Sequence, residues 1–121
     1  MPKFITKEIH AYLDYPVAIS LLGLPFILGL GQSSPFAFWL SVATGAAALL
    51  LTLLTDHHLG LIRVLPYNVH LTVDGIVGVV FVLAPIILGF TGLDFAYYLT
   101  LGIVVLIVVT SHKADMVAVP A

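Results

Sequence analysis

One 22-residue segment of this chain occurs twice, and this duplication constrains the fold more than any other feature. Residues 9–30 read IHAYLDYPVAISLLGLPFILGL, and residues 69–90 read VHLTVDGIVGVVFVLAPIILGF. An ungapped alignment gives seven identities: His10/His70, Asp14/Asp74, Val17/Val77, Pro25/Pro85, Ile27/Ile87, Leu28/Leu88 and Gly29/Gly89. Aliphatic matches are expected between any two apolar segments, but a His, an Asp, a Pro and a Gly in register are not. The sequence therefore predicts an internal duplication that repeats polar groups at fixed positions.

The composition indicates a membrane protein. Hydrophobic residues make up 61% of the 121 residues and charged residues 8%, whereas a soluble domain has about 25% charged residues. A membrane-spanning helix needs roughly 20 mostly apolar residues, and four segments qualify: about 9–31, 35–55, 68–91 and 94–111. We therefore expect an all-α membrane protein with a single four-helix transmembrane domain over residues 1–121. The absence of cysteine excludes disulfides and thiolate metal sites.

Each copy, about 8–56 and about 66–112, is predicted to form a hairpin of two spanning helices. Because a hairpin crosses the bilayer twice, both copies begin on the same side. They are expected to be parallel repeats, related by a pseudo-twofold axis along the membrane normal. The first and third helices should then face each other at the centre. The fourth helix, with its bulky β-branched run at 103–109, should be peripheral.

Prolines and glycines mark structural positions in both copies. Pro25 and Pro85 lie inside predicted helices, where each frees a carbonyl one turn earlier. Gly29 and Gly89 follow them and are predicted to end these helices. Asp94 is expected to cap the fourth helix. Aromatic residues early in the second and fourth helices should form a belt at the membrane–water interface: Phe36, Phe38, Trp39, Phe95, Tyr97 and Tyr98.

Basic residues predict the orientation in the membrane. The loops between the first two and the last two helices contain no Lys or Arg, and all four basic residues lie on the opposite side: Lys3, Lys7, Arg63 and Lys113. Cytoplasmic loops carry an excess of Lys and Arg. We therefore expect a multi-pass protein of the inner (plasma) membrane with both termini in the cytoplasm.

Three segments resemble the SPW-repeat family of small bacterial and archaeal integral membrane proteins. That family is named for a Ser-Pro-Trp near the outer end of its duplicated helices, followed by a short aliphatic run and Gly. The matching segments here are LPFILG at 24–29, APIILG at 84–89 and LGLIRVLPYNVHLTVD at 59–74. The resemblance covers about residues 8–112, although neither copy keeps the Ser or the Trp. It implies a duplicated membrane-helix fold and brings no activity with it.

The motif His-x-x-x-Asp occurs in both copies, at His10/Asp14 and His70/Asp74. Residues four apart share one face of a helix, so each carboxylate can hold its histidine. One interpretation is purely structural: these groups cap helices, stay hydrated at the interface or cross-link helices 1 and 3. The alternative is a ligand site. His10 and His70 would then be axial ligands to a haem or hold a pigment, all four residues would bind a divalent metal, or all four would relay protons.

A second histidine cluster lies at Asp56, His57 and His58, with His112 at the matching end of the fourth helix. It is either a metal site or a solvated helix end that interacts favourably with the helix dipole. Tyrosines near the cytoplasmic side are predicted to be interface anchors: Tyr12, Tyr15 and Tyr67.

The leading functional hypothesis is a non-enzymatic structural or accessory subunit of a membrane assembly, without a cofactor. Small residues on one face of the second helix are expected to receive another helix: Ser41, Thr44, Gly45, Ala48 and Thr52. The expected partners are the lipid bilayer, other membrane subunits or a second copy of the chain, and not nucleic acid. The alternative is a haem-, pigment- or metal-binding membrane protein, and the third hypothesis is a small transporter or channel.

Overall fold

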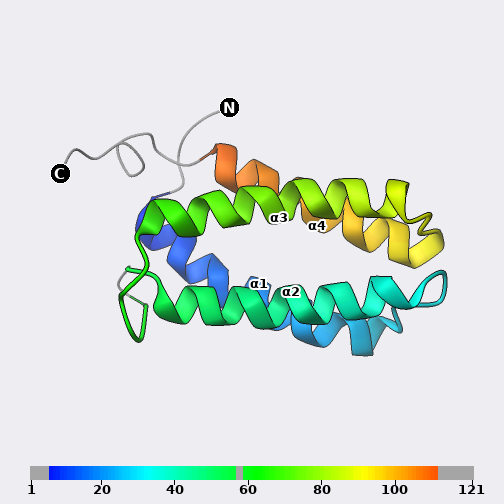
Figure 1. Cartoon of the computed structure of the whole chain (residues 1–121), viewed down its shortest axis with the longest axis horizontal. Coiled ribbons are helices and arrows are strands. Elements are labelled where there is room, and N and C mark those ends of the chain that lie inside the picture. Colours follow the sequence, from blue (N-terminus) through cyan, green and yellow to red (C-terminus); the bar gives the residue numbers. More distant parts are fainter. Residues whose placement is uncertain (1–5, 57–58, 112–121) are drawn as a thin grey trace.

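The computed structural model describes residues 6–56 and 59–111. Within them the chain forms four helices: α1 (Lys7–Leu28), α2 (Pro35–Leu54), α3 (Tyr67–Ile87) and α4 (Gly92–Thr110) (Figure 1). All four are long and apolar enough to cross a membrane. The prediction of an all-helical chain with four candidate spans is confirmed, and the observed ends lie within a few residues of the predicted ones.

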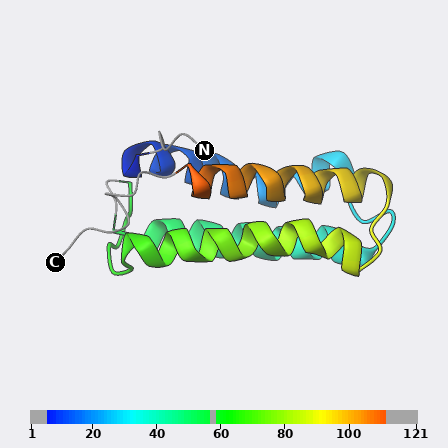
Figure 2. The same cartoon turned by 90° about the horizontal axis from the view of Figure 1, so that it is seen from above.

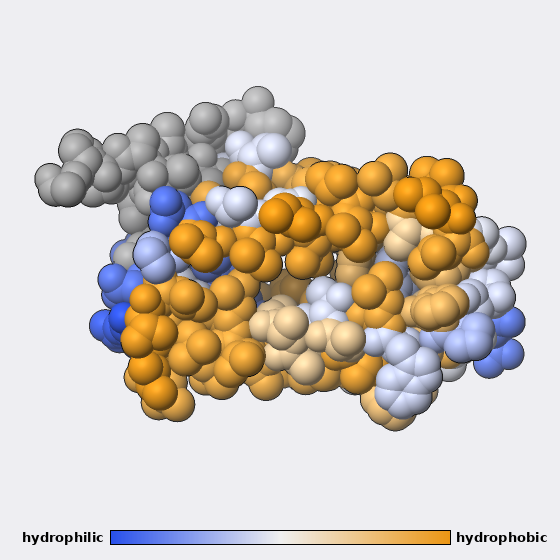
Figure 3. Space-filling view, viewed as in Figure 1, coloured by the Kyte–Doolittle hydropathy of each residue, from blue (hydrophilic) through white to orange (hydrophobic). Residues whose placement is uncertain are grey.

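The four helices pack as two hairpins. α1 lies along α2 and α3 lies along α4, whereas α2 and α3 touch only slightly. Figures 1 and 2 show that α1 and α3 run in the same direction and begin at the same end of the bundle. That end is called the linker end, because the connection from α2 to α3 lies there, and the opposite end is called the turn end. The face of the bundle that Figure 3 shows is mostly apolar, as expected for helices in contact with lipid.

Glycines let the helices of each hairpin approach closely. A Cβ atom on Gly45 of α2 would lie 2.8 Å from the backbone nitrogen of Leu22, and one on Gly102 of α4 would lie 2.9 Å from that of Val82. The small-residue face of α2 therefore packs against α1 inside the hairpin, with Ser41 and Gly45 buried. α1 thus covers Ser41 and Gly45 of this face, whereas Thr44, Ala48 and Thr52 line a cavity inside the bundle. That the face receives a helix of another subunit stays a prediction.

α4 is not peripheral, contrary to the prediction. It packs along α3 as α1 does along α2, and it buries Asp94, Tyr97, Tyr98 and Gly102. The prediction rests on the β-branched run at 103–109, but lipid tails and protein interiors favour the same side chains. Such a run therefore does not reveal which face packs against protein.

The ends of α1 and α3 are built alike. Gly29 and Gly89 adopt left-handed backbone angles, with φ of 67° and 72°. The amide after each glycine donates to the carbonyl of the preceding proline, from Leu30 to Pro25 at 3.0 Å and from Phe90 to Pro85 at 2.9 Å. Glycine adopts this conformation without the steric cost of a Cβ atom. The repeated Pro and Gly thus produce the same helix ending in both copies.

A buried aromatic core fills the turn end. Tyr97 and Tyr98 are 6% and 0% exposed, so they are not part of an interfacial belt as predicted, although Phe36 and Trp39 are exposed. The hydroxyl of Tyr98 donates to the carbonyl of Ala37 at 2.7 Å. The Ser41 hydroxyl donates to the carbonyl of Leu21, one of those freed by the helix prolines, and lies 2.7 Å from the Tyr97 hydroxyl. Buried tyrosines require such partners.

Asp94 joins the two turns and does not cap α4. Thr91 is the residue that precedes α4, and it makes no side-chain cap. The Asp94 carboxylate accepts hydrogen bonds from the Gly31 amide (2.9 Å), the Ser33 amide (2.9 Å) and the Ser33 hydroxyl (2.6 Å). The predicted cap is therefore wrong, because the turn of the other hairpin offers three donors that Asp94 reaches from the first turn of α4.

Candidate metal centre

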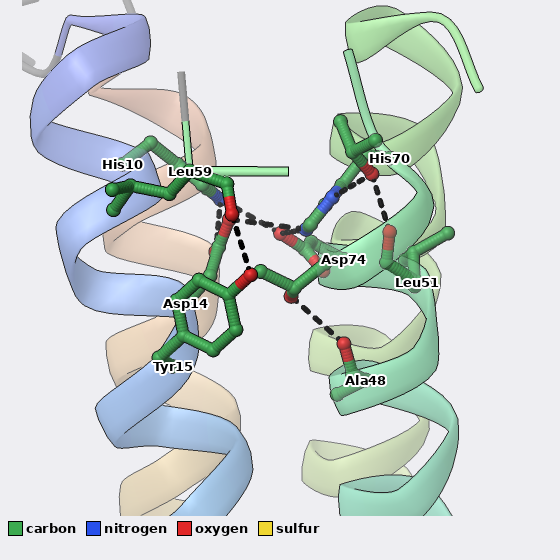
Figure 4. A network of polar contacts seen from close by, with 10 residues as sticks. His10, Asp14, Tyr15, Ala48, Leu51, Leu59, His70 and Asp74 are labelled. Carbon is green, nitrogen blue, oxygen red and sulfur yellow. Dashed lines mark hydrogen bonds and ion pairs between the residues drawn. The ribbon is translucent and has the colours of Figure 1, made fainter. Parts of the chain in front are cut away.

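The repeated His and Asp residues meet at the linker end (Figure 4). His10 and Asp14 come from α1, and His70 and Asp74 come from α3; together they are called the His/Asp cluster. His10 Nε2 lies 2.9 Å from Asp14 Oδ1 and 2.8 Å from Asp74 Oδ2. His70 Nε2 lies 3.4 Å from Asp14 Oδ2 and 3.2 Å from Asp74 Oδ2. One ligand atom from each of the four residues can be chosen so that all lie within 4.8 Å of one another.

Helix geometry explains the convergence. The four-residue spacing places the His and Asp of each copy on one helix face, one turn apart. Because α1 and α3 run in the same direction from the same end, the two pairs lie at the same level. The helices meet here through side chains, since the close backbone packing of α1 is with α2 and that of α3 is with α4. At this level the predicted contact of helices 1 and 3 is made by side chains, those of the cluster and the Tyr67 ring against His10.

The cluster is buried. His10 and His70 are each 2% exposed and Asp14 is 9% exposed, while the Asp74 side chain is 20% exposed. Neither aspartate caps a helix. Thr6 caps α1 by accepting from the Ile9 amide at 3.1 Å, which leaves Asp14 two turns inside. The interpretation of these residues as helix caps is therefore wrong. Their contacts instead cross-link helices 1 and 3, as the same interpretation also allowed, through His10 with Asp74 and His70 with Asp14.

Thr55 determines the tautomer of His70. The Thr55 hydroxyl lies 2.6 Å from the carbonyl of Leu51 and 2.6 Å from His70 Nδ1. A carbonyl can only accept, so the single hydroxyl proton is donated to Leu51, and the hydroxyl oxygen accepts from His70 Nδ1–H. In the neutral ring, Nε2 is then an acceptor that faces two carboxylates. A proton or a metal ion has to lie between these groups.

Nothing in the sequence pattern identified Thr55. A threonine at the end of an apolar helix is common, so its presence there does not indicate a site residue. The partnership with His70 depends on how α2 meets α3, which the spacing within one helix does not encode.

Tyrosines surround the linker end of the cluster. The Tyr67 ring lies against both imidazoles, with ring centroids 5.9 Å from His10 and 6.3 Å from His70. The Tyr15 hydroxyl donates to the carbonyl of Leu59 at 2.6 Å and so ties α1 to the linker. Of the three tyrosines predicted as interface anchors, Tyr12 is exposed and Tyr67 is buried.

A cavity of about 510 Å³ extends from the His/Asp cluster toward the middle of the bundle. All four helices line it, and the four cluster residues form part of its wall. Apart from the cluster, the polar residues that the described part of the chain contributes to the wall are Thr44 and Thr52 of α2. Figure 3 shows an opening between α2 and α3 on the face of the bundle.

The second predicted histidine cluster is only partly described. His57, His58 and His112 lie outside the described residues, so the metal site predicted there stays a prediction. No family model, curated protein or solved structure matches this chain. The resemblance to the SPW-repeat family also stays a prediction.

Proposed function

We propose that this chain is a multi-pass membrane protein that binds one divalent transition-metal ion at the His/Asp cluster. The observation that carries the proposal is the orientation of His70. Thr55 holds the proton on Nδ1, and Nε2 faces the carboxylates of Asp14 and Asp74. A metal ion at this point would satisfy all three groups. Ligating histidines are commonly held by a hydrogen bond to their other ring nitrogen in this way.

The ligand set suits an ion such as Zn²⁺. Zinc bonds to histidine nitrogen and carboxylate oxygen are about 2.0–2.2 Å long, so tetrahedral ligand atoms lie roughly 3.3–3.5 Å apart. The Nε2–Oδ separations from His70, 3.2 and 3.4 Å, are close to that spacing. Those from His10, 2.8 and 2.9 Å, are hydrogen-bond distances that would lengthen slightly around an ion. Four protein ligands make a closed site of the structural kind.

A haem fits this arrangement less well. The plane of a haem ligated by both His10 and His70 would have to lie between the two imidazoles. Asp74 Oδ2 contacts both rings there, at 2.8 and 3.2 Å, and its side chain would have to leave. The geometry therefore favours a single ion.

The proposal includes the symmetry and orientation predicted from the sequence. Each repeat contributes one His and one Asp, which supports a pseudo-twofold axis through the cluster. The distribution of Lys and Arg supports a cytoplasmic position for the linker end and for both termini. An ion bound there would join the two hairpins at the linker end, as the hydrogen bonds of Asp94 join them at the turn end.

Metal analysis of the purified full chain tests the proposal. His57, His58 and His112 are first replaced by Ala, so that other histidines do not contribute. After removal of metal with a chelator, equilibrium dialysis against Zn²⁺ should load about one ion per chain. The double variant Asp14→Asn/Asp74→Asn should lose this ion, and Glu8→Gln, which removes an exposed carboxylate of α1, should keep it. Equal zinc loading of the double variant and its parent would refute the proposal.

The remaining hypotheses stay predictions. A structural or accessory role in a membrane assembly is compatible with a closed metal site and requires no enzymatic activity. For a transporter or channel, the cavity offers few polar groups beyond the cluster.

A further inference from the structure

The cavity that begins at the His/Asp cluster has the size of a small-ligand site. Its volume of about 510 Å³ lies within the range of such pockets, about 300–1,000 Å³. Along α2 its wall extends from Ala43 to Thr52, which is roughly 14 Å at the rise of an α-helix. Half of the hydrocarbon core of a bilayer is about 15 Å thick. The cavity is therefore about as long as the hydrocarbon chain of one lipid.

The opening of the cavity indicates where a ligand would come from. The two hairpins touch only slightly between α2 and α3, and Figure 3 shows an opening there, surrounded by hydrophobic side chains. Since both helices are candidate membrane spans, this opening would face hydrocarbon. The apolar wall includes Val17, Leu21, Val77 and Val105, which offer no hydrogen bonds to water. A ligand would therefore enter from the bilayer, and most of its surface would be apolar.

The charge of the cluster favours a ligand without a charge of its own. In the ion-free protein the two carboxylates are balanced by protons on the two histidines, and in the metal-bound protein they are balanced by the divalent ion. The cluster thus carries no net charge in either state. Among the described residues no Lys or Arg lines the cavity. A charged head group would leave water without a compensating charge, which is costly.

Asp74 offers an acceptor for a neutral head group. Its contacts with the two histidines are both made by Oδ2, 2.8 Å from His10 Nε2 and 3.2 Å from His70 Nε2. Its other oxygen, Oδ1, receives no hydrogen bond from the described residues. The Asp74 side chain lines the cavity and is 20% exposed. A carboxylate oxygen next to an apolar space needs a donor, and a hydroxyl group supplies one without adding charge.

We infer that the cavity binds one long-chain alcohol, a neutral single-chain lipid with a hydroxyl head group. The hydroxyl donates to Asp74 Oδ1, and the hydrocarbon chain lies between the two hairpins. The metal ion of the proposed function would lie at Asp74 Oδ2, so the alcohol and the ion do not compete. The inference goes beyond the proposed function and does not rest on it, because Oδ1 is an acceptor whether or not an ion binds.

Native mass spectrometry of the full chain in detergent tests the inference with two probes at equal concentration, hexadecan-1-ol and hexadecyl methyl ether. The ether has the same hydrocarbon chain and an oxygen that accepts, but it has no O–H donor. We expect one bound hexadecan-1-ol per chain and at least tenfold weaker binding of the ether. Equal binding of the two probes would overturn the inference, because it would show that the chain alone is recognised. Displacement of the alcohol by Zn²⁺ would also overturn it, because the hydroxyl would then occupy the metal position.

Replacement of the acceptor tests the role of Asp74 directly. Asp74→Leu keeps a side chain of similar size and removes both oxygens. It should lower the binding of hexadecan-1-ol to the level of the ether and leave the binding of the ether unchanged, which also shows that the cavity is intact. A tenfold preference for the alcohol that persists in Asp74→Leu would overturn the assignment of the hydroxyl to Asp74.

Two neighbouring positions on α2 provide a matched pair of variants for the cavity. Ala47 lines it, whereas Ala46 does not. Ala47→Phe should fill the cavity and lower hexadecan-1-ol binding at least tenfold, while Ala46→Phe should leave it unchanged; equal binding by the two variants would overturn the inference. Neither position belongs to the cluster, so both variants should keep zinc. Zinc binding without alcohol binding in the parent would overturn this inference alone, and alcohol binding without zinc binding would overturn the proposed function alone.

Discussion

Asp94 on α4 accepts two hydrogen bonds from Ser33, one from its amide at 2.9 Å and one from its hydroxyl at 2.6 Å. The Ser33 hydroxyl oxygen also accepts from the Thr91 amide at 3.1 Å. These bonds join the turn of the first hairpin to the turn of the second. The His/Asp cluster joins the same two hairpins at the linker end. The bundle thus has a buried polar connection at each end. The apolar cavity begins at the His/Asp cluster, at the linker end.

Replacement of Asp94 should release the turn end. Asp94 is 1% exposed, and hydrogen bonds to a charged group contribute about 1.5–3 kcal/mol each. We expect Asp94→Ala to lower the free energy of unfolding by about 3 kcal/mol, because it leaves the donors of Gly31 and Ser33 without this acceptor. Denaturant titration in detergent measures the change. Asp56→Asn, at an exposed position, serves as the control, and an equal effect of both variants would contradict the proposed connection.

The two cluster aspartates should differ in their contribution to stability. From the sequence alone, the milder effect is expected for Asp14, because it lies early in its helix and close to Pro16. The structure reverses this order, because Asp14 is the more buried carboxylate, with side-chain exposures of 8% for Asp14 and 20% for Asp74. We expect Asp14→Asn to cost about 2–3 kcal/mol and Asp74→Asn about 1 kcal/mol in metal-free protein. Thermal melts of the two single variants decide the order, and a larger loss for Asp74→Asn would restore the sequence-based expectation.

Close packing within the hairpins predicts opposite effects of two Gly→Ala substitutions. A Cβ atom at Gly45 would lie 2.8 Å from a backbone atom of α1, whereas one at Gly23 would have no neighbour within 4 Å. Gly45→Ala should therefore destabilise the protein by about 1–3 kcal/mol through overpacking. Gly23→Ala should stabilise it by about 0.5–1 kcal/mol, because alanine loses less backbone freedom in a helix. Unfolding of both variants in the same detergent provides the comparison, and a neutral Gly45→Ala would contradict the packing of α1 on α2.

Local patterns predicted the four helices and the residues of the candidate site. The helices follow from uninterrupted apolar segments, and the four-residue spacing places each His with its Asp on one face. The packing of one hairpin on the other was not predictable in this way. Tyr97 and Tyr98 resembled interfacial aromatics, but they donate or accept hydrogen bonds inside the core. Asp94 resembled a helix cap, but its partners lie about sixty residues earlier. In a membrane, an apolar side chain suits lipid and protein equally, so such contacts leave little trace in the sequence.

Thr55 provides the most specific test of the metal proposal, because it does not belong to the four ligands. Its hydroxyl donates to the carbonyl of Leu51 and accepts from His70 Nδ1–H, which directs Nε2 toward the carboxylates. Loss of such a supporting group usually lowers metal affinity by about 10–100-fold. We therefore expect Thr55→Val, which keeps the shape but removes the hydroxyl, to weaken zinc binding by about that factor in a chelator competition assay. Thr55→Ser should restore the affinity, since it returns the hydroxyl. If Thr55→Val binds zinc as tightly as the parent, then His70 is not held by Thr55 for metal binding. The hydrogen bond would in that case serve only to join α2 to α3.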